Sequence, residues 1–270
     1  MIATHSGNPS VGIWKRCGAV AVACSILWVP LGEAQKLDPA SGYPQGFEEI
    51  APGEALDRLA QETKVRWRQM YREPQLSPST ERVRVSFTLG GLVADCYLAV
   101  KAGDAQQIKN VNQDIMKYCG ALGLAEKLNP RIHSASRLAE SEDWNGVRKE
   151  ISEGQGTIEK LLVEQRDRDL AILVDLGMWS RLLEISAGAL VDDPAVKNKS
   201  LAIGSTSLLN YMADRYQHIS PAVRDDDPVI FISNVVTYLQ KHWSDDSPTA
   251  ETVAVTLEKL KFLNARMSVK

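Results

Sequence analysis

Apolar residues recur with the period of an α-helix along most of the chain, and two stretches are apolar on nearly every face. The first covers residues 80–102, and the second, LAILVDLGMWSRLLEISAGAL, covers residues 170–190. A helix without a polar face is normally buried by the fold. The pattern therefore predicts two central apolar helices with amphipathic helices packed around them.

Seven further segments have one apolar and one polar face, which is the pattern of amphipathic helices. They cover residues 52–71, 105–122, 129–141, 143–165, 207–219, 229–243 and 249–268. Pro52 and Pro130 suit a first helical position, and Gly154 and Gly156 predict a kink or short break in the helix that contains them. We predict an all-α fold, a single globular bundle of about eight or nine helices.

A faint internal repeat leaves a second architecture open. LAVKAGDAQQIK from Leu98 and LAESEDWNGVRK from Leu138 both place an acidic turn between two helices. Their offset of about 40 residues is typical of helical-hairpin repeats. The alternative fold is therefore a short α-solenoid of helical hairpins.

The N-terminal residues differ from the rest and resemble an export signal in their order of features. The basic pair Lys15 and Arg16 precedes the apolar run CGAVAVACSILWVPLG, and Gly32 and Ala34 are small residues before Gln35. This order predicts a signal peptide over 1–34, cleaved after Ala34. It is followed by a flexible tail over 35–51 and an all-helical domain over 52–270.

Export through such a signal predicts a periplasmic or secreted protein. A less favoured alternative reads AVAC, ending at Cys24, as a lipoprotein box that would anchor the chain to a membrane. A retained, uncleaved anchor is a third option, although the apolar run is short for a span of about 20 residues.

Charge argues against two classes of partner. The full chain has a formal net charge of −3, and removing the predicted signal makes it one unit more negative. Without a basic excess we expect no nucleic-acid partner and no attraction to an anionic membrane. Asp175, Arg181 and Glu184 would be costly in lipid, so we also expect no membrane span in the mature chain.

The predicted mature chain keeps two cysteines, Cys96 and Cys119. If Gly103 and Asp104 form a turn between antiparallel helices, Cys119 lies about 14 Å beyond the residue that faces Cys96. A disulfide requires Cα atoms within about 7 Å. We therefore favour two buried free thiols.

Asp175 is the strongest candidate for a ligand-binding residue, because it projects into the apolar face of its helix. An unpaired carboxylate there would be strongly destabilised. Arg168, two turns earlier on the same side, is one candidate partner, and a Tyr, Arg or Lys from a neighbouring helix is another. Arg181 and Glu184 fall on a different stripe, which we expect to be partly wet.

Asp95 raises a milder form of the same question in the first apolar helix. Gly90 and Gly91 in that helix and Gly177 and Gly188 in the other would allow the two helices to approach closely. If they pack together, Asp95 and Asp175 could share one internal site with raised and split pKa values. The preferred interpretation is that each carboxylate is a satisfied structural hydrogen-bonding group.

The sequence has no motif that identifies an enzyme. The histidines His133, His218 and His242 are far apart, and we find no Glu-x-x-His pair, Gly-x-Ser-x-Gly or Ser-x-x-Lys. We therefore expect no catalytic residues, no cofactor and no metal. The favoured function is a non-enzymatic binding or scaffold protein with a possible envelope protein partner. The alternative is a small-molecule-binding protein or hydrolase with its acidic site at Asp175, Asp95 and Arg168.

Overall fold

The computed structural model describes residues 51–74, 77–193, 206–243 and 248–268. Across these residues the chain forms ten α-helices and one 3-10 helix, and no strand, as the sequence pattern predicts. The elements are α1 (Pro52–Glu62), η1 (Trp67–Met70), α2 (Arg82–Ala102), α3 (Ala105–Ala121), α4 (Ala125–Glu140), α5 (Trp144–Glu164), α6 (Arg168–Asp192), α8 (Thr206–Gln217), α9 (Pro221–Arg224), α10 (Asp227–His242) and α11 (Ala250–Ser268).

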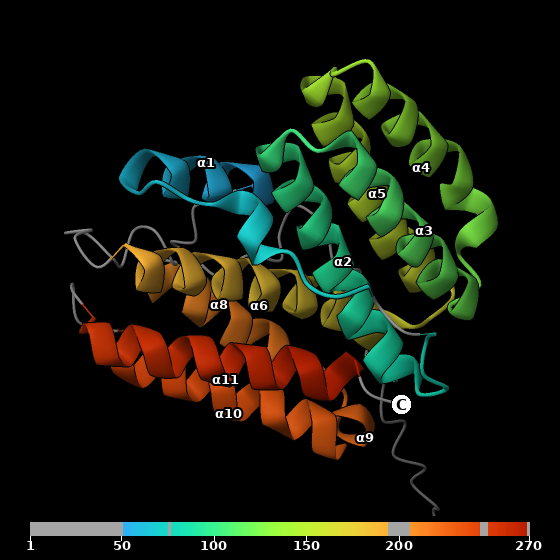
Figure 1. Ribbon diagram of the computed structural model, residues 1–270. Coiled ribbons are helices and arrows are strands. Elements are labelled where there is room, and N and C mark those ends of the chain that lie inside the picture. The colour runs from blue at the N-terminus through green and yellow to red at the C-terminus, as the bar shows by residue number, and fades with distance from the viewer. Residues whose placement is uncertain (1–50, 75–76, 194–205, 244–247, 269–270) are drawn as a thin grey trace, which may run out of the picture. The chain divides into compact units, whose positions relative to one another are not determined.

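The two central apolar helices are α2 and α6, which cross in close contact (Figure 1). Glycine allows this approach on each side. A Cβ added at Gly90 would lie 1.8 Å from the carbonyl oxygen of Val174, and one added at Gly177 would lie 1.9 Å from that of Phe87. Backbone thus meets backbone where the helices cross, which confirms the predicted role of these two glycines.

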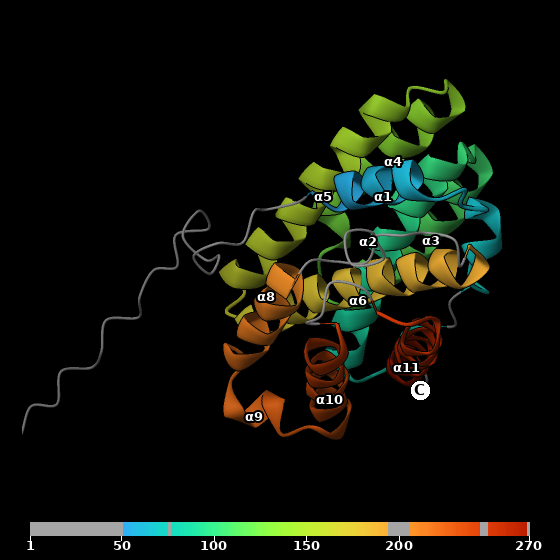
Figure 2. The ribbon, with the colours of Figure 1, turned by 90° about the vertical axis from the view of Figure 1, so that its left-hand side faces the viewer.

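The remaining helices cover the central pair from two sides (Figures 1 and 2). Helices α3, α4 and α5 follow α2 as an antiparallel series, while α8 and α11 pack on α6 on the other side and α10 packs on α8 and α11. Because α2 packs against α6, with three helices between them in sequence, contacts are not confined to successive hairpins. The fold is a bundle rather than the alternative solenoid.

The turn between α2 and α3 forms as predicted. Gly103 adopts a left-handed conformation, with φ at 59°, and the Asp104 side chain accepts a hydrogen bond from the backbone N–H of Gln107 at the start of α3. Cys96 and Cys119 are both buried and free, as the helix geometry predicts. Burial raises the pKa of the Cys119 thiol to about 12, so this group is neutral.

Two predicted helix boundaries are wrong, and one short helix was missed. The helix predicted over 52–71 ends at Glu62, because Thr63 turns to an extended conformation and its hydroxyl donates to the Asp193 carboxylate at 2.8 Å. Helix α4 begins at Ala125 rather than beside Pro130, which lies inside the helix. The short helix α9 was not predicted.

Of the predicted kink or short break in α5, the break is wrong, since this helix is continuous over 21 residues. Gly154 and Gly156 both lie within it, and neither adopts a positive φ. Glycine lowers helix stability by roughly 1 kcal/mol relative to alanine, which this long helix tolerates.

One of the described helices, α2, is long and apolar enough to cross a membrane. Of the apolar window in this helix, 89% is buried inside the bundle, as in a core helix of a soluble protein. The predicted signal peptide over 1–34 and nearly all of the predicted tail over 35–51 lie outside the described residues, so these assignments remain predictions.

Candidate functional site

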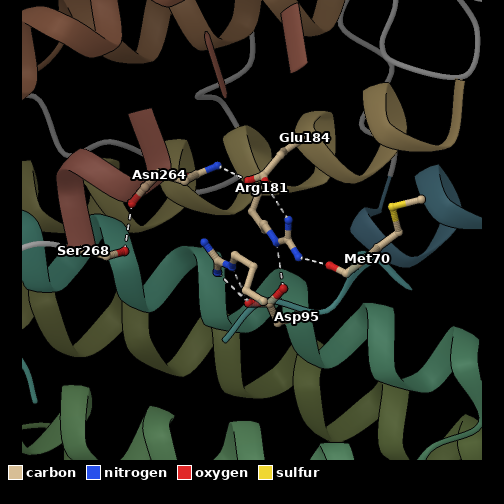
Figure 3. Close-up of polar contacts among 7 residues, drawn as sticks. Met70, Asp95, Arg181, Glu184, Asn264 and Ser268 are labelled. Carbon is tan, nitrogen blue, oxygen red and sulfur yellow. Dashed lines mark hydrogen bonds and ion pairs between the residues drawn. The ribbon is translucent and has the colours of Figure 1, made fainter. Parts of the chain in front are cut away.

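Asp95 lies at the centre of a buried ionic cluster between α2 and α6 (Figure 3). Its Oδ1 accepts a hydrogen bond from Arg181 Nε of α6 at 2.8 Å. Its Oδ2 accepts two from Arg72, which follows η1, one of them from Nε at 3.2 Å. We define the buried ionic cluster as Arg72, Asp95, Arg181 and Glu184.

Glu184 completes this cluster one turn along α6. Its Oε1 lies 2.8 Å from Arg181 Nη1, and its Oε2 accepts a hydrogen bond from the Asn264 amide of α11 at 2.6 Å. Arg181 Nη2 donates to the Met70 carbonyl of η1. The cluster therefore ties η1 and α11 to the two central helices.

The prediction of a partly wet stripe on this helix is wrong. Arg181 and Glu184 do pair with each other, but they are only 2% and 6% exposed. Helix α11 and the segment around η1 cover them. Gly188 on the same stripe faces the Met70 side chain, since an added Cβ would lie 3.0 Å from Met70 Sδ.

The buried ionic cluster balances two carboxylates against two guanidinium groups. Burial raises the pKa of Asp95, but the neighbouring Arg181 and Arg72 outweigh this effect and hold it below its usual value. Burial likewise opposes the charge on Arg181, and Asp95 and Glu184 nevertheless raise its pKa. Asp95 and Arg181 are thus held in their charged forms, and all four side chains are paired within the cluster, which suits a structural role better than acid–base catalysis.

Asp175 has its own partners, both from α8. Tyr211 Oη donates to Asp175 Oδ2 at 2.6 Å, and Arg215 Nε lies 3.4 Å from the same oxygen. The predicted alternative of a Tyr or Arg from a neighbouring helix is therefore confirmed, whereas no hydrogen bond or ion pair joins Asp175 to Arg168. Burial raises the pKa of Asp175, and Arg215 and Tyr211 offset that rise only in part.

The three residues predicted to form one site are not brought together. Among the described residues Asp95 and Asp175 have no partner in common, so the hypothesis of a shared carboxylate site is not supported. Arg168 begins α6 and lines an open surface pocket with Arg82 and Asp167.

A groove on the other side of the molecule is a better candidate for binding. It lies between α2, α3, α4 and α5, and we call it the Gly154 groove. It contains about 410 Å³ of empty space, part of it open to solvent. Its apolar lining comes from all four helices: Val93, Ile115, Leu128, Ile132, Ala135, Ile151 and Ile158.

Polar side chains from all four helices also line this groove. Cys96 lies on α2 and Asn112 on α3, and the Asn112 amide donates to the Ile132 carbonyl at 3.2 Å and to Ser136 Oγ at 2.9 Å. Arg131 lies on α4 and Glu150 on α5, and Arg131 Nη1 donates to Glu150 Oε2 at 3.1 Å.

Gly154 leaves the groove open along α5. A Cβ added at this position would meet nothing within 4 Å. The sequence drew attention to this glycine as the place of a kink or short break, and the structure shows no break there. A pattern of apolar positions on single helices cannot show which residues of four helices will face one space, so Asn112, Arg131 and Gly154 were not predicted as groove residues.

The part of the chain that the structure describes contains no group of three or more His, Cys, Asp or Glu side chains placed to hold a metal ion. Comparison with protein-family models, with curated proteins and with solved structures finds no match to the chain.

Proposed function

We propose that this chain is an exported, non-enzymatic binding protein, and that its ligand is a small component of the periplasm or cell envelope held in the Gly154 groove. The groove is lined mainly by apolar side chains from four helices, with a few polar groups beside them, which is the general character of small-molecule sites. Its space accessible to water, about 40 Å³, is too small for a segment of a partner protein and admits only a small group.

The observation that carries this proposal is the open space beside Gly154. Glycine in a helix interior costs roughly 1 kcal/mol relative to alanine. At Gly154 neither a positive φ nor a close neighbour requires it. If a ligand occupies the groove, a larger side chain at position 154 would block it, which explains why glycine is present there despite its cost to the helix.

The candidate acids support binding rather than catalysis. Asp95 is fixed between two guanidinium groups, and Asp175 is held by Tyr211 and Arg215. Neither carboxylate lines the Gly154 groove. The Cys96 thiol does line it, but burial raises its pKa far above neutrality, so it is not a nucleophile.

Gly156 provides a matched control on the same helix. It also has no neighbour within 4 Å of an added Cβ, but it does not line the groove. Leucine at either position should improve helix propensity equally. Only Gly154→Leu should fill the groove.

The test is to purify the full chain and both leucine variants without detergent, denature them and identify released small molecules by mass spectrometry. We expect a molecule from the wild type and Gly156→Leu that is absent from Gly154→Leu. The same release from all three proteins would exclude the groove as the site. No release from any of them, with no change in hydrogen exchange of α5 when envelope extract is added, would contradict the proposed function.

A further inference from the structure

We propose that a second binding site, which takes a phosphate group, lies where α5 ends and α6 begins. The site is the pocket lined by Arg82, Arg166 and Arg168, and we call it the arginine pocket. It is separate from the Gly154 groove and does not depend on the proposed function. Three observations support it: the charge of the lining, the lack of partners for two arginines, and the unfavourable local positions of those arginines.

The arginine pocket is formed by three parts of the fold. Its lining comes from the first turn of α2, Arg82 and Val83, from residues 166–170 at the start of α6, and from Val223 of α9. It offers about 320 Å³ of space accessible to water and is open to solvent. A small molecule can therefore enter it without a change in the fold.

Both carboxylates of the arginine pocket are engaged by other groups. Asp167 Oδ2 lies 2.7 Å from Arg82 Nη2. Asp169 accepts hydrogen bonds from the Ser220 backbone N–H at 3.0 Å and from the Ser220 hydroxyl. Three guanidinium groups and two carboxylates leave the lining with one excess positive charge. The pocket therefore attracts an anion rather than a neutral or cationic group.

Two of the three guanidinium groups are available to a ligand. Among the residues that the structure describes, the side chains of Arg166 and Arg168 have no hydrogen-bond or ion-pair partner. A guanidinium group presents its N–H donors in a planar fork that matches the oxygens of a phosphate or a carboxylate. Because two unpaired guanidinium groups line one pocket, a divalent phosphate gains more there than a monovalent carboxylate does.

Arginine is a locally unfavourable residue at both positions. Arg166 adopts a left-handed backbone conformation, with φ at 65°, which strains a residue other than glycine. Two earlier turns of the same kind have glycine there, Gly103 and Gly123. Arg168 is the first residue of α6, where the helix dipole disfavours a positive charge. A phosphate bound by both side chains explains why arginine is present at both positions.

Glu142 provides a matched control for Arg166. It adopts the same left-handed conformation, with φ at 59°, in the turn between α4 and α5, and it does not line the arginine pocket. In both turns the N–H of the following residue donates to the carbonyl five residues earlier. Glycine relieves the same strain at either position, so Arg166→Gly and Glu142→Gly should both keep or raise the Tm. Only Arg166→Gly removes a group from the pocket.

Calorimetric titration of the full chain with inorganic phosphate, glycerol 3-phosphate and acetate tests this inference. We expect both phosphates to bind at one site per chain, and acetate to bind more weakly by about tenfold or more. Arg166→Gly and Arg168→Gln should each weaken phosphate binding by about tenfold or more, the effect of a hydrogen bond between charged groups. Glu142→Gly should leave it unchanged. So should Lys127→Gln, which removes an exposed positive charge of α4 outside the pocket.

The same titrations can overturn the site. No binding of either phosphate to the wild type would do so, as would equal weakening by Lys127→Gln and Arg166→Gly, which would indicate only a general attraction to positive charge. Acetate binding as tight as that of phosphate would show that the ligand class is wrong. A Tm lowered by Arg166→Gly but not by Glu142→Gly would assign Arg166 a structural role instead.

Comparison of the two phosphates identifies the source of the group. Tighter binding of glycerol 3-phosphate would assign the pocket to an organic phosphate, and equal binding would assign it to the free ion; both results support the site. Neither result bears on the proposed function, because the arginine pocket and the Gly154 groove share no lining residue.

Discussion

Asp95 and Asp175 are acids on neighbouring core helices, but their surroundings act in opposite directions. Two guanidinium groups contact Asp95 and lower its pKa. Asp175 has one guanidinium and one phenol, its side chain is 16% exposed, and burial raises its pKa. The folded protein therefore favours the ionised form of Asp95, whereas it disfavours the ionised form of Asp175.

The two carboxylates should therefore respond differently to the same substitution. Asp95→Asn leaves two buried guanidinium groups against one carboxylate, and removing one partner of a buried pair costs about 3–5 kcal/mol. Asp175→Asn keeps an acceptor for Tyr211 and removes a desolvated charge, so we expect a change below about 1.5 kcal/mol. Urea denaturation of both variants measures these free energies of unfolding. Equal losses would contradict the assignment.

The lowered pKa of Asp95 also predicts a dependence of stability on acid. Above an unfolded pKa of about 3.9 the carboxylate is ionised in both states and contributes fully to stability. That contribution is lost as the pH falls through the lower pKa of the folded protein. The free energy of unfolding, measured from pH 5 to pH 2, should fall more steeply for wild type than for Asp95→Asn. Asp57, whose pKa is also lowered, is present in both proteins and cancels in the comparison.

At this scale the sequence predicted which groups needed partners but not which partners they would find. Asp175 was recognised because a carboxylate interrupts an apolar helical face. Its partners Tyr211 and Arg215 come from α8, and Arg72, a partner of Asp95, comes from an irregular segment after η1. Such pairings depend on tertiary packing, which the periodicity of one helix does not contain.

Among the elements, the crossing of α2 and α6 determines the rest of the packing. Its closest contacts are backbone to backbone, at Gly90 and Gly177. Of the four glycines expected to allow this approach, Gly90 and Gly177 lie at the crossing, whereas Gly91 and Gly188 face the side chains of Arg72 and Met70. Helix ends were predicted less well, since the end of α1 depends on a hydrogen bond from Thr63 to Asp193, 130 residues away in sequence.

A methyl group at this crossing should be costly. In Gly90→Ala the new Cβ would lie 1.8 Å from the Val174 carbonyl oxygen and 2.7 Å from the Met178 nitrogen, so the two backbones must separate. Overpacking of a core typically costs about 1–3 kcal/mol. Because this clash is with backbone, we expect Gly90→Ala to lower the free energy of unfolding by about 3 kcal/mol or more. Thermal unfolding should show a clear drop in Tm.

Gly156→Ala is the control for this substitution, because it has the same chemistry in open space. It should raise stability by about 0.5–1 kcal/mol, through helix propensity alone. A Gly90→Ala variant as stable as Gly156→Ala would show that α2 and α6 do not meet as described.

On the scale of the whole molecule, the proposal of export makes a prediction about the N-terminus. Expressed in a bacterium, the full chain should reach the periplasm with an intact mass equal to residues 35–270, because small residues at Gly32 and Ala34 suit signal peptidase. Ala34→Phe should block this cleavage. A chain that keeps its N-terminus in the cytoplasm would contradict export, and a lipidated chain beginning at Cys24 would support the lipoprotein alternative.

The central claim is that ligand enters the Gly154 groove, and four isoleucines, Ile115, Ile132, Ile151 and Ile158, report on it directly. In a methyl-resolved NMR spectrum of the isoleucine-labelled full chain freed of bound molecules, adding back the molecule released from the wild-type protein should shift these four δ1-methyl signals. The signals of Ile172 and Ile185 in α6, which do not line the groove, should stay unchanged. Shifts at Ile172 and Ile185 without shifts at the four groove isoleucines would contradict the account.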